Sequence, residues 1–122
     1  MAVSVSLSFD YTDGRISETF VATQTATNTE KGYLVQVPTL GTASSQISTA
    51  TLSTLGYSYM RSLVTTTEAT CTITFGKLDG ATMHNVATLR PGEIATLRLA
   101  SGDYAAKAAD EGYQLLIAAV EE

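Results

Sequence analysis

The stretch that decides the fold is Leu89-Arg-Pro-Gly-Glu-Ile-Ala-Thr-Leu-Arg-Leu-Ala100. Pro91 holds φ near about −65°, which suits the second position of a β-turn, and Gly92 tolerates the positive φ that a type II turn requires at the third. After this turn, apolar and polar residues alternate from Ala95 to Leu99. A period of two residues is typical of a half-buried strand. The stretch therefore predicts a tight turn that leads into a strand, and we expect this strand to be an internal one.

Strand patterns of the same kind recur along the chain. The clearest lies near the N-terminus, where apolar residues from Val3 to Tyr11 alternate with serines. Turn residues such as Asp13-Gly14 and Asp79-Gly80 separate the strands. Pro38 ends the third strand, because proline has no N–H for the ladder. Strands are predicted over residues 3–11, 16–26, 33–37, 47–52, 57–63, 70–75, 95–99, 104–108 and 113–120, with a surface loop over 39–46 and a weakly patterned stretch over 82–88.

The C-terminal part of the chain allows two interpretations over residues 104–111. By propensity, Ser101-Gly-Asp103 followed by an alanine-rich run indicates an N-capped helix that ends at Gly112. Such a helix has only about two turns and is marginal by itself. We therefore predict a short strand or extended connection over 104–108, with the helix as the alternative. Residues 113–120 are apolar on both faces from Leu115 onward, which predicts a strand covered on both sides.

Short strands separated by frequent turns predict an all-β fold. We expect a single jelly-roll-like antiparallel β-sandwich of about eight strands, which forms one domain over residues 1–122. A chain of this length buries enough surface to need neither a metal nor a disulfide. The lack of an internal repeat of roughly 20 to 50 residues argues against a propeller or a solenoid.

Composition excludes several classes of protein. The net charge is −5, and the seven Lys and Arg residues are scattered singly, so no basic stripe is available for nucleic acid. No apolar run reaches the ~20 residues of a membrane span, and the first residues lack the pattern of a signal peptide. Cys71 is the only cysteine and is expected to act as a small core residue. We expect a soluble protein that binds neither nucleic acid nor a membrane.

Candidate catalytic residues are few. His84 is the only histidine, and no cysteine or serine is placed to form a nucleophile–base pair with it, so we expect neither an enzyme nor a cofactor. Glu93 follows the sharp turn and is interpreted as an acceptor for nearby backbone donors. Most other acids stand in turns, where aspartate is common, although a calcium site built from several loops is conceivable. These acids are Asp10, Asp13, Asp79, Asp103, Asp110 and Glu111.

Two sets of residues are candidates for binding. The six tyrosines, with no tryptophan, can either form a sugar-stacking platform or lie at the edge of the core. The second set belongs to the strand over 113–120, whose outer face is either covered by the sandwich or forms a subunit interface. The residues of that face, and thus the candidate oligomer-interface residues, are Leu116, Ala118 and Val120.

The second half of the chain resembles small jelly-roll virion proteins of tailed bacteriophages. The resemblance rests on a strand after a glycine, a strand that ends in glycine, a Pro-Gly-Glu turn into a strand, an Ala-Lys-Ala segment and a final strand ending in acids. In this chain these are Gly56-Tyr-Ser-Tyr-Met-Arg-Ser-Leu63, Cys71-Thr-Ile-Thr-Phe-Gly76, Leu89-Arg-Pro-Gly-Glu-Ile-Ala-Thr-Leu-Arg-Leu99, Tyr104-Ala-Ala-Lys-Ala108 and Leu115-Leu-Ile-Ala-Ala-Val-Glu-Glu122.

The resemblance implies an accessory protein of the virion. Members of this group serve as cement or decoration proteins on the capsid or as small tail components, and they are often trimeric. We therefore expect a structural capsid decoration protein that docks as an oligomer, with a trimer favoured, on the major capsid protein or a neighbouring tail protein. The alternative is a tail or host-attachment component with a glycan-binding sandwich.

Overall fold

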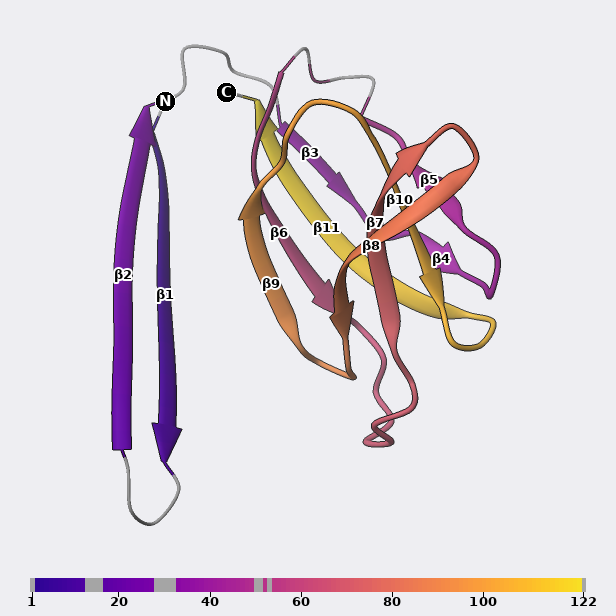
Figure 1. The fold of residues 1–122 in the computed structure, drawn as a ribbon, viewed down its shortest axis with the longest axis horizontal. Helices are drawn as coiled ribbons and strands as arrows, with labels where there is room; N and C mark the ends of the chain where they lie inside the picture. Colours follow the sequence, from indigo (N-terminus) through magenta and orange to yellow (C-terminus); the bar gives the residue numbers. More distant parts are fainter. Residues whose placement is uncertain (1, 13–16, 28–32, 50–51, 53, 122) are drawn as a thin grey trace. The chain divides into compact units, whose positions relative to one another are not determined.

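The computed structural model describes residues 2–12, 17–27, 33–49, 52 and 54–121 (Figure 1). The chain forms two compact units, Met1–Lys31 and Gly32–Glu122, each of which is considered by itself. The described residues form antiparallel strands and no helix, so the prediction of an all-β fold is confirmed. The prediction of one domain over residues 1–122 stays a prediction.

The first unit is a β-hairpin. Strands β1 (Ala2–Thr12) and β2 (Ser17–Thr27) pair in antiparallel register, with Phe9 opposite Phe20. Both strands predicted for this part of the chain are confirmed. The turn predicted at Asp13-Gly14 lies outside the described residues.

The second unit is a sandwich of two antiparallel sheets. One sheet has the order β5-β10-β7-β8, and the other has the order β3-β11-β6-β9, with β4 beside β11 (Figure 1). Their strands are β3 (Tyr33–Gln36), β4 (Thr39–Leu40), β5 (Ser45–Ile47), β6 (Leu55–Ser62), β7 (Ile73–Asp79), β8 (Thr82–Leu89), β9 (Ile94–Arg98), β10 (Asp103–Ala108) and β11 (Tyr113–Glu121).

The connections between these strands are those of a jelly roll. Pro38 interrupts the first strand, so that β3 and β4 run one after the other along β11. After that, consecutive strands change sheet each time, except for the β7–β8 hairpin. Among the described residues 33–121, eight strands then build the sandwich when β3 and β4 count as one. The predicted jelly-roll-like sandwich is therefore confirmed, and the strands of the N-terminal hairpin are not part of it.

The core lies between the two sheets. Met60, Ile73 and Phe75 are inaccessible to solvent. The rings of Phe75 and Tyr104 stack with their centroids 5.3 Å apart, and the Tyr104 hydroxyl donates a 2.6 Å hydrogen bond to the Ala100 carbonyl. Burial raises the pKa of Tyr104. Cys71 is buried as predicted, in the segment just before β7.

The C-terminal ambiguity is resolved in favour of strands. Residues 103–108 form β10, which pairs with β7 on one side and β5 on the other, and no helix forms over 104–111. Ala105 and Ala106 are fully buried, because small side chains suit an inner position of a sheet. The strand predicted over 113–120 is confirmed as β11, which lies between β3 and β6.

The turn in the stretch 89–100 forms as predicted. The Glu93 N–H donates a 3.0 Å hydrogen bond to the Arg90 carbonyl, and Gly92 has φ of 76°. The Glu93 carboxylate accepts a 2.8 Å hydrogen bond from the Arg90 N–H, which confirms its interpretation as a backbone acceptor.

The expectation that the strand after this turn is an internal one is wrong. β9 ends the sheet and pairs only with β6 in the described chain, because alternation reports which face is buried but not a strand's place in the sheet.

Two further strand predictions are corrected. The segment 82–88 forms most of β8, an edge strand exposed on both faces for most of its length, which explains its weak pattern. Opposite the step from Phe75 to Gly76, Val86 is an extra residue in β8 and forms a bulge. Of the strand predicted over 47–52, only Ile47 lies in a strand, β5 over 45–47, while residues 50 and 51 lie outside the described residues. The predicted loop over 39–46 contains β4 and the start of β5.

Replacement of Gly76 by alanine tests the contact of β7 with β8. A Cβ at this position would collide with the His84 carbonyl oxygen and lie 2.8 Å from the Met83 Cγ atom. Because the first obstacle is backbone, we expect Gly76→Ala to lower the free energy of unfolding by about 1–3 kcal/mol. Urea denaturation measures this change. Gly80→Asn is the control, since Gly80 has φ of 60° with open space around it and asparagine tolerates that conformation. A Gly76→Ala protein as stable as the control would contradict the packing.

Glu93 provides a test of the turn. Glu93→Ala removes the acceptor of the Arg90 N–H and should cost about 0.5–1.5 kcal/mol of unfolding free energy. Glu93→Gln keeps a side-chain oxygen and should restore most of that loss. Thermal denaturation of the two variants checks the prediction, and equal losses in both would refute the hydrogen bond's role.

Candidate interaction surface

The strand register of the five-stranded sheet divides its residues between the core and an outer face. Ala118 lies opposite Val35 on one neighbouring strand and Tyr59 on the other, and Val120 lies opposite Tyr33. We define the outer face by the residues that alternate with the buried ones on these strands. They are Tyr33 and Val35 of β3, Thr39 of β4, Tyr57, Tyr59 and Arg61 of β6, Ile94, Thr96 and Arg98 of β9, and Gln114, Leu116, Ala118 and Val120 of β11.

The outer face exposes large apolar side chains. Tyr33 is 72% exposed, Val35 59% and Ile94 55%, and Tyr59 is also exposed. Val37 and Leu63 continue the alternation of β3 and β6 beyond the ends of these strands, and both are exposed. Soluble monomers rarely expose large contiguous apolar patches, so this face has the character of an interaction surface.

The three residues singled out from the sequence lie at the centre of this face. Leu116, Ala118 and Val120 are half-buried on β11, while Leu115, Ile117 and Ala119 on its other side are buried in the core. Both halves of the apolar pattern of β11 are therefore explained. One half fills the sandwich, and the other half forms the middle of the outer face.

Sequence reasoning missed the larger members of this face because of two buried serines. In β6 the residues facing the core are Ser58, Met60 and Ser62, while Tyr57 and Tyr59 face outward. The Ser58 hydroxyl donates a 2.9 Å hydrogen bond to the Leu97 carbonyl, which satisfies this buried polar group. From the sequence alone, these tyrosines belong either to a platform or to the edge of the core, and the pairing of β6 places Tyr57 and Tyr59 on the outer face. The apolar residues at every second position from Tyr33 to Val37 were the available signal.

The two arginines of the outer face give it a positive character. The Arg98 guanidinium carbon lies 4.7 Å from the centre of the Tyr57 ring, a cation–π arrangement that holds the arginine against the sheet. Arg61 lies opposite Ile94 and Leu116. The residues that define the face include no acid.

The outer face of the four-stranded sheet differs in character. Its central row in the register consists of exposed Gln46 and Asn85 with buried Ala105 and Gly76 between them. Among the described residues of this sheet, Val86 is the only large apolar residue whose side chain is exposed. The sandwich therefore has one apolar outer face and one small and polar outer face.

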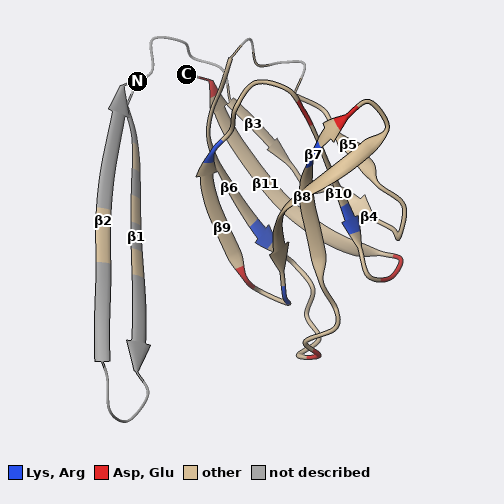
Figure 2. Cartoon of the chain, viewed as in Figure 1, with Lys and Arg blue, Asp and Glu red and all other residues tan. Residues whose placement is uncertain are grey.

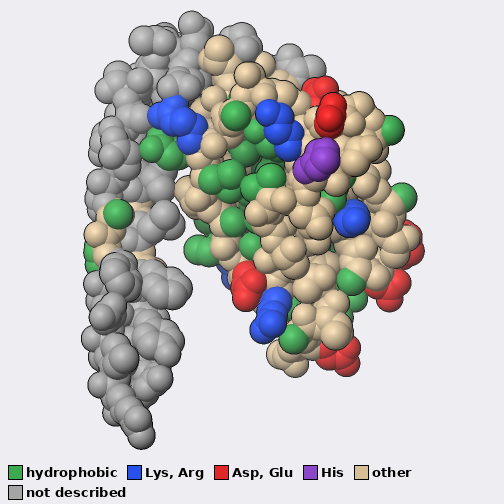
Figure 3. All heavy atoms as spheres, viewed as in Figure 1, with side chains coloured by type: hydrophobic (Ala, Val, Ile, Leu, Met, Phe, Trp, Pro, Cys, Tyr) green, Lys and Arg blue, Asp and Glu red, His purple; other side chains and the backbone are tan. Residues whose placement is uncertain are grey.

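The acids of the sandwich lie at strand ends and in the connections between strands (Figure 2). Glu111 accepts hydrogen bonds from the backbone N–H and the hydroxyl of Thr42, at 3.1 and 3.3 Å, so it supports a loop. Charged side chains are dispersed over the surface seen in Figure 3 and form no continuous patch of one sign there. Within the described part of the chain, no three His, Cys, Asp or Glu side chains gather as a metal site would require.

The residues considered for catalysis are not brought together. His84 is exposed on the edge strand β8, and Cys71 is buried ahead of β7. The Cys71 thiol lies 3.9 Å from a carboxylate oxygen of Glu68. A hydrogen bond with Cys71 and burial raise the pKa of Tyr113 to about 12, which makes this tyrosine a poor base at neutral pH.

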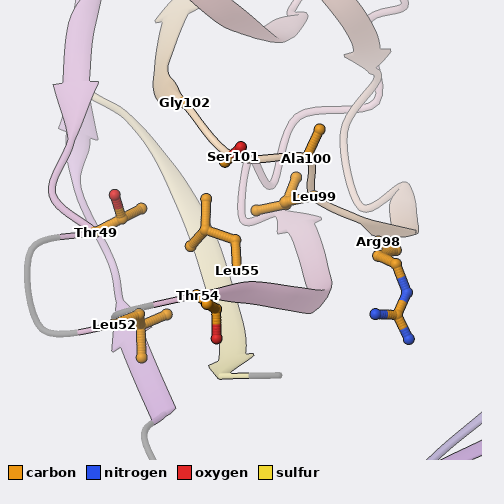
Figure 4. A pocket seen from close by; sticks show the side chains of 9 residues that line it. All are labelled: Thr49, Leu52, Thr54, Leu55, Arg98, Leu99, Ala100, Ser101 and Gly102. Carbon is orange, nitrogen blue, oxygen red and sulfur yellow. The ribbon is translucent and has the colours of Figure 1, made fainter.

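A hollow lies where the segment after β9 passes the start of β6. Its lining offers methyl groups, hydroxyls and one guanidinium, and the Arg98 side chain extends away from Leu55 and Leu99 (Figure 4). This lining provides no nucleophile–base pair. The lining residues are Thr49, Leu52, Thr54, Leu55, Arg98, Leu99, Ala100, Ser101 and Gly102.

Three of the tyrosines share the outer face although they are far apart in sequence. Tyr33 comes from β3, while Tyr57 and Tyr59 come from β6. Tyr104 lies in the core, and the side chain of Tyr11 lies outside the described residues. Three rings thus share one face, as the platform alternative requires, while Tyr104 belongs to the core.

Over the described residues, the structure has no helix of the length and apolarity needed to cross a membrane. Comparison of the chain with family models, curated proteins and solved structures found no match.

Proposed function

We propose that this chain is a non-enzymatic structural protein of a bacteriophage virion, which decorates the capsid by docking as an oligomer on the major capsid protein. The observation that carries the proposal is the exposed apolar outer face of the five-stranded sheet. An exposed apolar face of this kind favours assembly, because burying apolar surface contributes a free energy of about 25 cal/mol per Å².

Three other features support an assembly role. The residues that define the outer face include no His, Cys, Asp or Glu, and the acids that the structure describes in detail, such as Glu93 and Glu111, support turns and loops. Charged residues make up only 16% of the sequence, so few ions must be desolvated on docking. The strand and turn motifs of the second half resemble those of phage jelly-roll virion proteins.

The second candidate function is a tail or host-attachment component that binds glycans. The observation that favours it is the presence of Tyr33, Tyr57 and Tyr59 on one outer face, with Arg98 beside Tyr57. Tyrosine offers sugars a flat apolar ring and a hydroxyl for hydrogen bonding.

The composition of the purified particle tests the structural role. Quantitative mass spectrometry of intact virions should find the chain in hundreds of copies, as expected for a protein that covers a capsid lattice. A few copies would assign it to the tail instead. Its absence from purified particles would refute both virion roles.

A glycan array tests the second candidate. If the tyrosines stack on sugars, the protein binds a defined set of glycans, and Tyr33→Ala weakens that binding by about tenfold, the equivalent of about 1.4 kcal/mol. Val86→Ala on the other sheet serves as the control and should leave binding unchanged. Lack of binding to any glycan at high protein concentration eliminates this candidate.

A further inference from the structure

We propose that a second copy of this chain covers the outer face of the five-stranded sheet, so that two sandwiches pack face to face about a two-fold axis. This inference names the partner for the face on which the proposed function rests, and it proposes a two-fold pair in place of the trimer that the resemblance implies. It can fail while the virion role stands, because the two are tested by different measurements.

The size of the face suits such a pair. With about 3.4 Å per residue and about 4.8 Å between strands, the strands of this sheet cover roughly 450 Å² of flat area. Two copies therefore bury roughly 900 Å² of flat area, and the protruding side chains add to this value. This approaches the about 1,000 Å² of a specific interface. The hydrophobic residues needed for it are already exposed, namely Tyr33, Val35, Tyr59 and Ile94.

The shape of the face also suits a second copy. Sheets pack on other sheets about 10 Å apart with their strands nearly aligned, and an identical sheet supplies a surface of the same dimensions and pleat. Ala118, at the centre, is small and stands between Val35 and Tyr59, which lets the middles of two faces approach while larger side chains interdigitate around them. A two-fold axis through such a centre makes the contact self-complementary.

The distribution of residues places the contact on this face and not on its opposite. In the outward row of the four-stranded sheet, Gln46 and Asn85 are exposed while Ala105 and Gly76 are buried, so this row offers little apolar surface for a contact. Its edge strand β8 also carries the bulge at Val86, which disfavours addition of a further strand there. Self-association through the other sheet is therefore the arrangement that buries the larger apolar area.

Charge gives the pair a diagnostic response to salt. Each copy has a net charge of −5 and contributes Arg61 and Arg98 to the face, so two copies repel each other at low ionic strength. Salt screens this repulsion and does not weaken apolar contact. The dimer should therefore become tighter between roughly 0.05 and 0.5 M salt, whereas docking on an acidic partner would become weaker.

The test compares two matched valines on edge strands. Val35 of β3 is 59% exposed on the proposed contact face, and Val86 of β8 is 51% exposed on the other sheet. Sedimentation velocity of the wild-type chain at micromolar concentrations should give twice the monomer mass of 12.8 kDa. Val35→Asp should raise the dimer dissociation constant by about tenfold or more, because it buries an unpaired charge, and Val86→Asp should leave that constant unchanged.

Three results would overturn the proposal. The first is a wild-type chain that stays monomeric at about 100 μM, and the second is equal dimer dissociation constants for the two aspartate variants. The third is a trimer, because in a trimer this face would have to contact a different surface of its neighbour. Circular dichroism verifies that each variant is folded. If Val35→Asp does not fold, Tyr33→Ser at the 72% exposed position provides the same comparison. A monomeric chain found in hundreds of copies on the particle would refute the pairing and leave the virion role intact.

Discussion

The rest of the sandwich depends on the pairing of β11 with strands on both of its sides. β3 and β4 lie along one edge of β11 and β6 along the other, so the last strand of the chain joins the first strand of the sandwich to its middle. Leu115 and Ile117 then fix one side of β11 in the core, against Phe75 and Met60 of the same cluster. Because side chains alternate along a strand, the same pairing forces Leu116, Ala118 and Val120 outward. The core and the candidate interaction surface are two consequences of one strand.

Local chemistry allowed much of the fold to be predicted. The Pro91-Gly92 turn, the Asp79-Gly80 hairpin and the end of β3 before Pro38 each follow from the backbone preferences of one or two residues. The strand character of β10 and β11 follows from the apolar pattern and the shortness of the competing helix. What failed were predictions that depend on the neighbours of a strand. β9 lies at a sheet edge although its sequence alternates as an internal strand does, and β8 was missed because most of its residues are exposed on both faces, which leaves the alternation weak.

The candidate surface was predicted only at its centre. Leu116, Ala118 and Val120 were identified because a strand with two apolar faces needs something on each side. Tyr57 and Tyr59 were not, because buried Ser58 and Ser62 place serines where apolar residues are expected. Tyr33 and Val35 joined the surface through long-range pairing with β11, which no local pattern reports. The difference between the two outer faces of the sandwich is thus a property of the assembled sheets. It leaves the sandwich with one outer face of exposed apolar side chains, on which the proposed assembly rests.

The central claim is that the outer face of the five-stranded sheet is covered when the protein is assembled. Hydroxyl-radical footprinting, with mass spectrometric detection, compares side-chain reactivity in the dilute free chain and in the assembled state. We predict that Tyr33, Tyr59 and Ile94 are reactive in the free chain and protected on assembly, while Val86 reacts equally in both states. Equal reactivity of Tyr33, Tyr59 and Ile94 before and after assembly would contradict the account.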